Sequence, residues 1–496
     1  MADPQNSAPP RTTTPRSPAP NPATPEALLE QAVAARQNGD LDLAAQALED
    51  LLAVAPRHPV PLRLRARVAL ERAEPDALAR FDTALRADPG NADLHLGKAQ
   101  ALDVAGDTRG AQIVARQIVE QAPGFTEALT FLSSLHLASG EADFTAPFAA
   151  AVQKAPQDPN IRIAWIDALA GIERFAEAAE IAAQARAAFT HEPHFVLLEA
   201  IQAGSAGEWA RAEALFAELQ TQSLQRYLAE ARHRLRAGDW ASAQTNLDHA
   251  FSRAPREVAA WALQGLLWRL DARPEAQARA RWLHEQAGLV QFRPLLAEPD
   301  VLDRARARLE ELHRAAGMPL NQSLRGGSQT RGVLFQRSEP ALAALHVAIR
   351  ATLEAYRADL PPADPAHPLL AQRETPWKLA GSWSVRLTCG GDHHAAHIHP
   401  AGLISSALYL TVPSETQASE EDAEHPGWLE LGRAPADLGL TLDPLTRIRP
   451  IEGYLALFPS TLYHGTRPFT AGTIDAGTVT ERLTVAFDVI TNHPEV

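Results

Sequence analysis

Three histidines near the end of the chain combine a residue type and a spacing that suit metal chemistry. His397 and His399 form an H-x-H pair, and His464 follows later in the chain. Side chains alternate along an extended strand, so an H-x-H pair on a strand directs both imidazoles to one face. A third histidine from a later strand can complete a facial site with positions open for substrate and oxygen. We therefore expect these three histidines to bind a metal ion.

The segment around these histidines has the pattern of an all-β domain. From Trp377 onward, β-branched residues alternate with polar residues between turn signals, which predicts about eight short strands. Such a set is typical of a jelly-roll sandwich or barrel, whose mouth commonly holds a ligand. The candidate strands are Ser382–Thr388, His397–His399, Ser405–Val412, Gly427–Leu431, Arg447–Pro450, Tyr454–Pro459, Leu462–His464 and Arg482–Ile490. Helices are expected before them, over Pro299–Ala316 and Pro340–Leu360, with a polar loop between.

The first half of the chain, from Pro25 to Val290, has apolar residues at helical spacing. A fixed pattern of glycine-aspartate, alanine and proline recurs in it, with identical spacing after Gly39, Gly106 and Gly238. Glycine turns the chain between two helices, alanine permits close packing, and proline ends the pair. With a period near 34 residues, this pattern resembles the tetratricopeptide repeat, and we count about seven units.

A helix pair of this kind cannot bury its apolar face alone, so neighbouring pairs stack into a superhelix with a concave surface. The surface could serve only to build the solenoid, or it could bind a peptide. We favour a groove for a protein or peptide partner. The sequence does not indicate which residues would contact that partner.

Composition limits the remaining possibilities. A chain of 496 residues is too long for one core, and we divide it into a Pro-rich tail (1–24), helical repeats (25–290) and a C-terminal domain (291–496). The net charge of −14 argues against binding to a nucleic-acid backbone. A single cysteine, Cys389, excludes an internal disulfide, and we expect an inert thiol. The tail lacks the apolar core of a signal peptide and no membrane span is evident, so we expect a disordered tail and a cytoplasmic protein.

Several motifs of the second half occur together in one known family. In chain order they are Gln322–Thr330, Gly381–Leu387, His397–Pro400, Ile404–Tyr409, Leu457–Ser460 with His464–Thr466, and Arg482–Asp488. Together they resemble the bacterial 2-oxoglutarate/Fe(II) oxygenases that follow tetratricopeptide repeats. The resemblance covers roughly 319–489. It implies a double-stranded β-helix, ferrous iron, 2-oxoglutarate as cosubstrate, and dioxygenase activity.

The resemblance also assigns metal ligands. In that superfamily, iron is usually held by an H-x-D pair and a distal histidine. His397 and His399 occupy the positions of the pair and His464 the distal position, so a histidine stands where a carboxylate is normally found. His394 could replace His397 as a ligand. Alternative carboxylates are Asp392, Glu430 and Asp488.

A cosubstrate with a carboxylate needs a fixed cation, and the planar guanidinium of arginine pairs with a carboxylate through two parallel bonds. By resemblance, Arg482 would bind the distal carboxylate of 2-oxoglutarate, with Thr484 on the same strand face. The longer spacing after His464 is assigned to a turn at Thr470–Thr480. Tyr409 is a candidate for a further hydrogen bond to the cosubstrate. Candidates for supporting or substrate contacts are His394, Arg386, Arg325 and Gln329.

Repeats joined to such a domain suggest hydroxylation by O2 of a protein or peptide side chain that the repeats present. Two other classes remain open. The spacing of Gly391 and Gly453 from the histidines also resembles the two cupin motifs, which would indicate a metal enzyme that does not use 2-oxoglutarate. The glutamate that usually follows the cupin H-x-H is absent. Alternatively, the chain could be a scaffold without catalytic activity.

Overall fold

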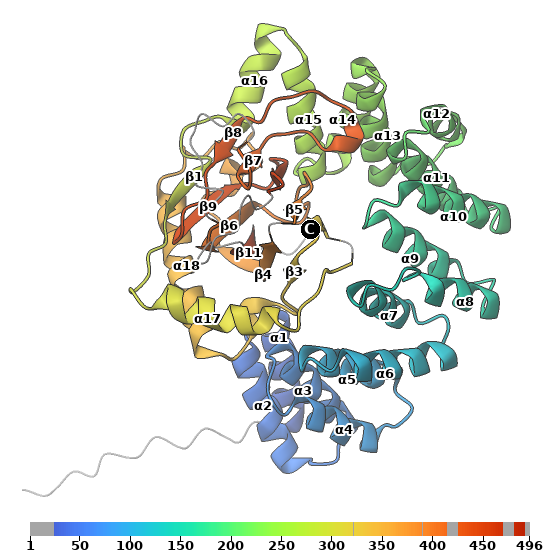
Figure 1. Ribbon diagram of the computed structural model, residues 1–496, viewed down its shortest axis with the longest axis vertical. Helices are drawn as coiled ribbons and strands as arrows, with labels where there is room; N and C mark the ends of the chain where they lie inside the picture. Colours follow the sequence, from blue (N-terminus) through green and yellow to red (C-terminus); the bar gives the residue numbers. More distant parts are fainter. Residues whose placement is uncertain (1–23, 321, 389, 414–424, 470–480, 492–496) are drawn as a thin grey trace, which may run out of the picture.

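The computed structural model divides the chain into a helical half and a half built on antiparallel sheets (Figure 1). It describes residues 24–320, 322–388, 390–413, 425–469 and 481–491. The predictions for the N-terminal tail, for Cys389 and for the turn at Thr470–Thr480 therefore lie outside the described residues, apart from Thr24, which caps the first helix. Within those ranges, no helix has both the length and the apolar character needed to cross a membrane.

Sixteen helices of the described chain form the first half, and consecutive helices pack as eight pairs, α1·α2 to α15·α16. The first four pairs are α1 (Pro25–Gln37), α2 (Leu41–Val54), α3 (Pro59–Glu71), α4 (Ala77–Ala87), α5 (Ala92–Val104), α6 (Thr108–Gln121), α7 (Thr126–Ala138) and α8 (Ala146–Lys154). The other four are α9 (Pro159–Ala170), α10 (Phe175–Ala188), α11 (Pro193–Ser205), α12 (Trp209–Glu218), α13 (Leu224–Arg236), α14 (Trp240–Arg253), α15 (Val258–Leu270) and α16 (Pro274–His284).

The recurring sequence pattern explains these pairs. Gly39 turns the chain after α1 with a φ of 81°, which L-residues adopt at a cost. The Asp40 side chain then accepts a hydrogen bond from the Leu43 N–H and caps α2. Ala44 is completely buried between the two helices. The fold of the first half is therefore the tetratricopeptide-like solenoid that the sequence predicts. The described residues form eight helix pairs, against about seven units counted from the sequence, and the turns of two pairs, α3–α4 and α15–α16, contain no glycine.

The described residues of the second half form three antiparallel sheets, consistent with a jelly-roll domain. Six strands form the large sheet in the order β1-β9-β6-β11-β4-β3, three form β10-β7-β8, and two form β2-β5. The strands are β1 (Gln291–Pro294), β2 (Leu324–Arg325), β3 (Ser328–Gln329), β4 (Trp377–Thr388), β5 (His393–His394), β6 (Ile404–Thr411), β7 (Leu429–Leu431), β8 (Thr446–Ile448), β9 (Tyr454–Pro459), β10 (His464–Thr466) and β11 (Glu481–Thr491). Single-turn 3-10 helices connect some of them.

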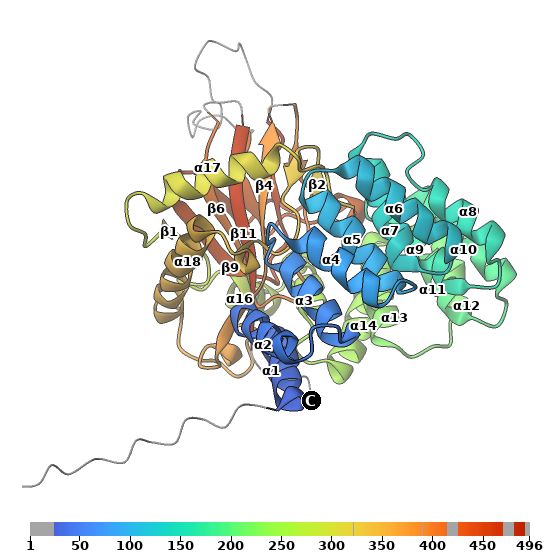
Figure 2. The ribbon, with the colours of Figure 1, turned by 90° about the horizontal axis from the view of Figure 1, so that it is seen from below.

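Strand β11 lies inside the large sheet, between β6 and β4, and its two faces have different roles. Leu483, Val485 and Phe487 are buried in a core that also contains residues of α17 (Val301–His313) and α18 (Pro340–Ala358). Figure 2 shows these two helices against the sheet. Arg482 and Thr484 have the opposite parity and line an internal cavity. The alternating sequence of β11 thus separates the core from the site.

Several local predictions differ from the structure. His397–His399 is not a strand: His397 forms an isolated antiparallel bridge with His464, and the chain turns immediately afterwards, where the Gly402 N–H bonds to the His399 carbonyl. Strand β1 was not predicted either, and it completes the large sheet by pairing with β9. The short strands β2, β3 and β5 were also missed, and the strand expected over Leu462–His464 runs from His464 to Thr466. These features depend on partners distant in sequence, which local periodicity does not reveal.

The solenoid curves around the sheet domain, so its concave side faces that domain (Figure 1). Ion pairs join the two halves at several repeats: Asp103 of α5 with Arg331 at 2.5 Å, Glu173 with Arg325 at 2.6 Å, and Asp437 with Arg232 of α13 at 2.5 Å. The Trp282 indole of α16 also donates to Asp364 at 2.9 Å. The concave surface is therefore partly covered by the chain's own second domain.

Candidate metal centre

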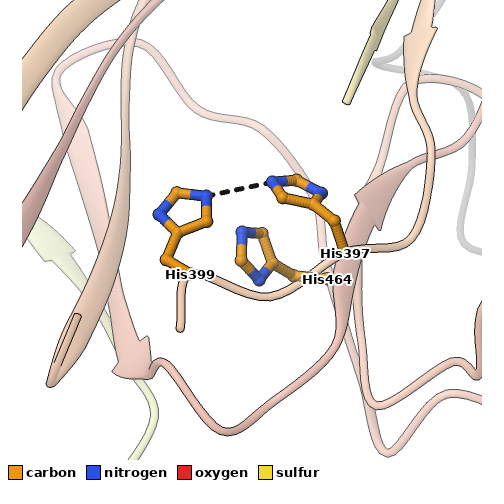
Figure 3. A group of neighbouring side chains, drawn as sticks. All are labelled: His397, His399 and His464. Carbon is orange, nitrogen blue, oxygen red and sulfur yellow. Dashed lines mark hydrogen bonds between the residues drawn. The ribbon is translucent and has the colours of Figure 1, made fainter. Parts of the chain in front are cut away.

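The three histidines predicted as metal ligands converge on one point (Figure 3). Each offers one ring nitrogen, and these atoms all lie within 4.8 Å of one another. In the part of the chain that the structure describes, this is the only group of three or more such side chains that could hold a metal ion. Two backbone hydrogen bonds between His397 and His464, at 2.9 and 3.0 Å, fix two of the rings against each other.

The Nδ1 atom of each histidine is already engaged. The Ala395 carbonyl accepts from His397 at 2.8 Å, and the Leu462 carbonyl accepts from His464 at 3.1 Å. The carboxylate of Asp488 accepts from His399. Because a carbonyl or carboxylate can only accept, each Nδ1 donates its hydrogen, and in a neutral imidazole the lone pair then lies on Nε2. This is the arrangement of a histidine that binds metal through Nε2.

The spacing of the nitrogens suits a divalent ion. The Nε2 atoms of His397 and His399 are 3.0 Å apart. Two nitrogens that each lie about 2.1 Å from an ion, at right angles to each other, are separated by about 3 Å. Burial lowers the pKa of His397 to about 3 and the pKa of His464 well below its usual value, and the neighbouring imidazoles add to both effects. Both rings are therefore neutral near pH 7, as a metal ligand must be.

A buried cation lies in the same cavity. The Arg482 side chain is 3% exposed, and its Nη1 donates to the Gly427 carbonyl at 2.8 Å. Among the described residues no carboxylate pairs with it, and its Nε has no hydrogen-bond partner. Burial lowers the pKa of Arg482 from its usual value, which still leaves the group charged near pH 7. Burying a charge without a counter-ion costs free energy, so the site is expected to bind an anion.

The other two residues predicted to bind the cosubstrate lie beside Arg482. Thr484 lines the cavity with it. The guanidinium carbon of Arg482 is 4.9 Å from the centre of the Tyr409 ring, a cation–π distance. The Tyr409 hydroxyl is completely buried and has no hydrogen-bond partner among the described residues. The unpartnered groups on Arg482 and Tyr409 could both bind one carboxylate.

The cavity between the histidines and Arg482 is small, about 50 Å³. Trp383, Val385 and Phe458 form apolar parts of its wall, and the Trp383 ring centre is 5.6 Å from that of His399. Apolar walls exclude water, which strengthens electrostatic interactions inside the site. The cavity can therefore hold a small polar ligand in a dry environment.

His394 lies next to the triad, outside the group of converging nitrogens. Its Nδ1 is 3.0 Å from the Ser323 hydroxyl, which in turn is 3.2 Å from the His397 Nε2. Ser323 was not predicted, because a serine in a polar loop carries no signal of its own. The hydroxyl therefore links His394 to the triad.

The remaining candidates lie at different places. Gln329 lines the metal cavity, and Arg325 lies at the mouth, where it pairs with Glu173 of the repeats. Arg386 is not part of the cavity wall, and its side chain pairs with Glu481 at 3.2 Å. Glu173 had no signal in the sequence, since its role depends on how the two halves pack.

None of the three alternative carboxylates joins the histidines as a direct ligand. Asp392 accepts hydrogen bonds from the N–H and hydroxyl of Thr388, both at 2.8 Å. Glu430 is paired with Arg433 and Arg447. Asp488 contacts the site through the outer nitrogen of His399.

Comparison with protein families agrees with this geometry. Residues 381–488 match the family described as "Putative 2OG-Fe(II) oxygenase", and residues 71–135 match the family described as "Tetratricopeptide repeat". The chain thus combines tetratricopeptide repeats with a domain of this oxygenase family, and the resemblance seen in the motifs is confirmed. The family description names 2-oxoglutarate and Fe(II), and the histidine triad could bind the metal.

No curated protein matches the chain. Among solved structures, MamA protein is 16% identical with a TM-score of 0.26, and the match covers 34% of this chain and 92% of that one. A tetratricopeptide repeat protein from Parabacteroides merdae is 17% identical with a TM-score of 0.32, covering 49% and 98%. PilW, a type IV pilus biogenesis factor, is 18% identical with a TM-score of 0.31, covering 38% and 90%. Scores this low carry no argument about function.

Proposed function

We propose that this protein is a 2-oxoglutarate/Fe(II)-dependent dioxygenase that hydroxylates a protein or peptide side chain reaching it along the repeats. The observation that carries the proposal is the buried guanidinium of Arg482, which pairs with no carboxylate among the described residues and lies in the cavity where three histidine Nε2 atoms meet. A metal triad alone would fit many enzymes. A fixed cation in the same small cavity indicates an anionic ligand beside the metal.

Each residue has a distinct task in this proposal. His397, His399 and His464 would hold ferrous iron, and Arg482 would bind the distal carboxylate of 2-oxoglutarate, with Thr484 and Tyr409 beside it. When bound, iron and 2-oxoglutarate would supply the chemistry that activates O2, so that one oxygen atom converts 2-oxoglutarate to succinate and CO2 and the other hydroxylates a C–H bond. Trp383, Val385 and Phe458 keep water from the reacting groups.

The cavities around the centre support a chain-like substrate. One of about 970 Å³ lies between the repeats and the sheet domain and shares His394 with the wall of the metal cavity. A second, of about 870 Å³, is lined by α3, α5 and α7 and shares Gln329. Pockets for small molecules usually range from about 300 to 1,000 Å³. The two cavities lie at the top of that volume range, and both adjoin the metal cavity. Together they are better suited to a polypeptide segment than to a metabolite.

Anaerobic titration of the full chain with Fe(II) and then 2-oxoglutarate tests the chemistry. We expect the metal-to-ligand charge-transfer band of a bound 2-oxo acid. Arg482→Ala should weaken 2-oxoglutarate binding by about a hundred-fold or more, because it removes one partner of a buried charge pair, and should spare Fe(II) binding. The matched control is Arg293→Ala, which removes a guanidinium from β1 that pairs with Asp359. A protein that binds Fe(II) but never 2-oxoglutarate would contradict the proposal and favour the cupin-type alternative.

The substrate class needs a separate test. The full chain with Fe(II), 2-oxoglutarate and O2 would be incubated with a peptide library, and products gaining one oxygen atom identified by mass spectrometry. Ala170→Trp, at the end of α9 in the cleft wall, should block hydroxylation while 2-oxoglutarate binding persists. Ala150→Trp, on the exposed side of α8, is the control. Unchanged peptide hydroxylation in Ala170→Trp would exclude this path, and a chain that hydroxylates nothing would favour the scaffold alternative.

A further inference from the structure

The three histidines differ in what holds their outer nitrogens. Neutral backbone carbonyls accept from His397 and His464, whereas a carboxylate, that of Asp488, accepts from His399. Imidazole ligands are neutral, so the triad itself gives a bound cation no negative charge. Asp488 is the carboxylate in direct contact with the triad.

We propose that Asp488 is a positioning residue that orients His399 and, through it, supplies the negative charge that the three-histidine centre lacks. The inference rests on the proposed function, since it concerns the same metal. A carboxylate that accepts the outer N–H of a metal-binding imidazole fixes the ring and increases the basicity of the nitrogen on the metal.

The surroundings of Asp488 do little to neutralise or screen its charge, which can therefore act on His399. The side chains of His399 and Asp488 are only 16% and 20% exposed, so water screens the pair weakly. Among the described residues, no arginine or lysine pairs with Asp488. Glu430, another carboxylate of the same domain, is paired with Arg433 and Arg447. Arginines thus neutralise the charge of Glu430, whereas the charge of Asp488 can act on the metal centre through His399.

Strand β11 places this carboxylate rigidly. Asp488 has the same parity as Arg482 and Thr484, so all three lie on the site face of one strand, while Phe487 and Val489 anchor the other face in the core. Arg482 and Asp488 therefore approach the site from opposite ends of that face. In the complete complex, the distal carboxylate of 2-oxoglutarate would pair with Arg482, and Asp488 would contribute its negative charge at the metal end of the site, through His399.

The test compares metal binding by full-length variants in the absence of 2-oxoglutarate. Asp488→Asn keeps an oxygen that can accept from the His399 N–H but loses the charge. Calorimetry should show Fe(II) or Co(II) affinity lowered by about 10- to 100-fold. The Fe(III)/Fe(II) midpoint potential should also rise, because the lost negative charge stabilises Fe(III) more than Fe(II). A purely orienting role would leave the potential unchanged. Asp392→Asn, a carboxylate in the same domain that bonds to Thr388, is the matched control and should bind metal as the wild type does.

A double variant distinguishes an effect of charge on metal binding from damage to the fold. His399→Asp alone would place a carboxylate against that of Asp488, and the repulsion should weaken metal binding. Adding Asp488→Asn should restore affinity by at least about ten-fold, which damage to the fold could not produce. Wild-type metal affinity and potential in Asp488→Asn would overturn the inference alone, as would a double variant no better than His399→Asp. A wild-type protein that binds no divalent ion would overturn both this inference and the proposed function.

Discussion

At the scale of single residues, the site is defined by which atoms have partners and which do not. The Nδ1 atoms of the three histidines are engaged, so their Nε2 atoms are left for a metal. On the other side of the cavity, the Nε of Arg482 and the hydroxyl of Tyr409 are buried and have no hydrogen-bond partner in the part of the chain that the structure describes. Leaving buried polar atoms unpaired costs free energy, and that cost is recovered when a ligand binds them.

Tyr409→Phe tests this directly, because its two effects should have opposite signs. Removing the unpartnered hydroxyl should leave the protein at least as stable, with a gain of up to about 1 kcal/mol in the free energy of unfolding. The same change should weaken 2-oxoglutarate binding and leave Fe(II) binding unchanged. Chemical denaturation and anaerobic titration would measure the two effects. A clear loss of stability would mean that the hydroxyl has a partner in solution.

At the scale of elements, the repeats share one rule for the turn between paired helices. Gly39 adopts a positive φ of 81° at this turn, and no atom would contact a side chain added there. Ala73 occupies the corresponding turn between α3 and α4 with a φ of 49°, and Glu173 does so between α9 and α10 with a φ of 64°. A non-glycine residue in this region is strained by about 1–2 kcal/mol. Two of the turns therefore carry strain that glycine would remove.

Exchanging glycine and alanine between two turns should have opposite effects. Ala73→Gly should raise the free energy of unfolding by about 1 kcal/mol, because it removes the strain of the left-handed backbone, and Gly39→Ala should lower it by a similar amount. Urea denaturation of each variant, monitored by circular dichroism, would measure the change. Changes of the same sign in both variants would show that side-chain packing, rather than backbone conformation, determines stability at these turns.

Helix α17 is tied to the large sheet by a buried histidine. The Ser328 hydroxyl donates to Nδ1 of His313 at 2.8 Å, and Nε2 donates to Ser384 at 3.0 Å, since the Ser384 hydrogen is used by the Thr484 carbonyl. Burial, and to a lesser degree the charge of Arg386, lowers the pKa of His313 to about 4. The folded protein therefore holds this imidazole neutral at pH values where the unfolded chain protonates it.

The sign of the resulting pH effect follows from proton linkage. An unfolded histidine binds a proton below about pH 6.5, whereas His313 in the folded protein does so only near pH 4, so stability should fall as the pH falls between these values. The full loss from this residue is roughly 3 kcal/mol. His313→Gln should show a shallower decline over this window, measured by denaturant unfolding at several pH values. Equal slopes in the variant and the wild type would contradict the assignment.

The sequence predicted the elements better than it predicted their contacts. The helix pairs and β11 follow from local periodicity, and the triad follows from residue types and spacing. The contact between Asp488 and His399 depends on how a loop crosses the last strand, and the pairing of Glu173 with Arg325 depends on how the two halves meet. The same limit applies to His397–His399, whose rings converge through a backbone bridge and a turn, without a strand. Long-range register of this kind has no signature within a short window of residues.

At the scale of the whole molecule, the repeats and the sheet domain are joined at several points along the solenoid. One of these points is Asp437, which forms ion pairs with two arginines of α13, Arg232 and Arg236. Burial alone would raise the pKa of Asp437, but the two guanidinium groups hold it below its usual value. These ion pairs hold α13 against the sheet domain at the wall of the cleft, which both Arg232 and Asp437 line.

Asp437→Asn should loosen the whole assembly. It leaves two arginines without a counter-charge, and the Arg236 side chain is only 3% exposed, so the loss should be about 3 kcal/mol. Calorimetry should then resolve two unfolding transitions, one for the repeats and one for the sheet domain, where the wild type shows one. Asp271→Asn, which removes a carboxylate paired with the exposed Arg273, should leave a single transition. If Asp437→Asn also unfolds in one step at the wild-type temperature, the halves are held together by apolar packing, and the cleft would not depend on this ion pair.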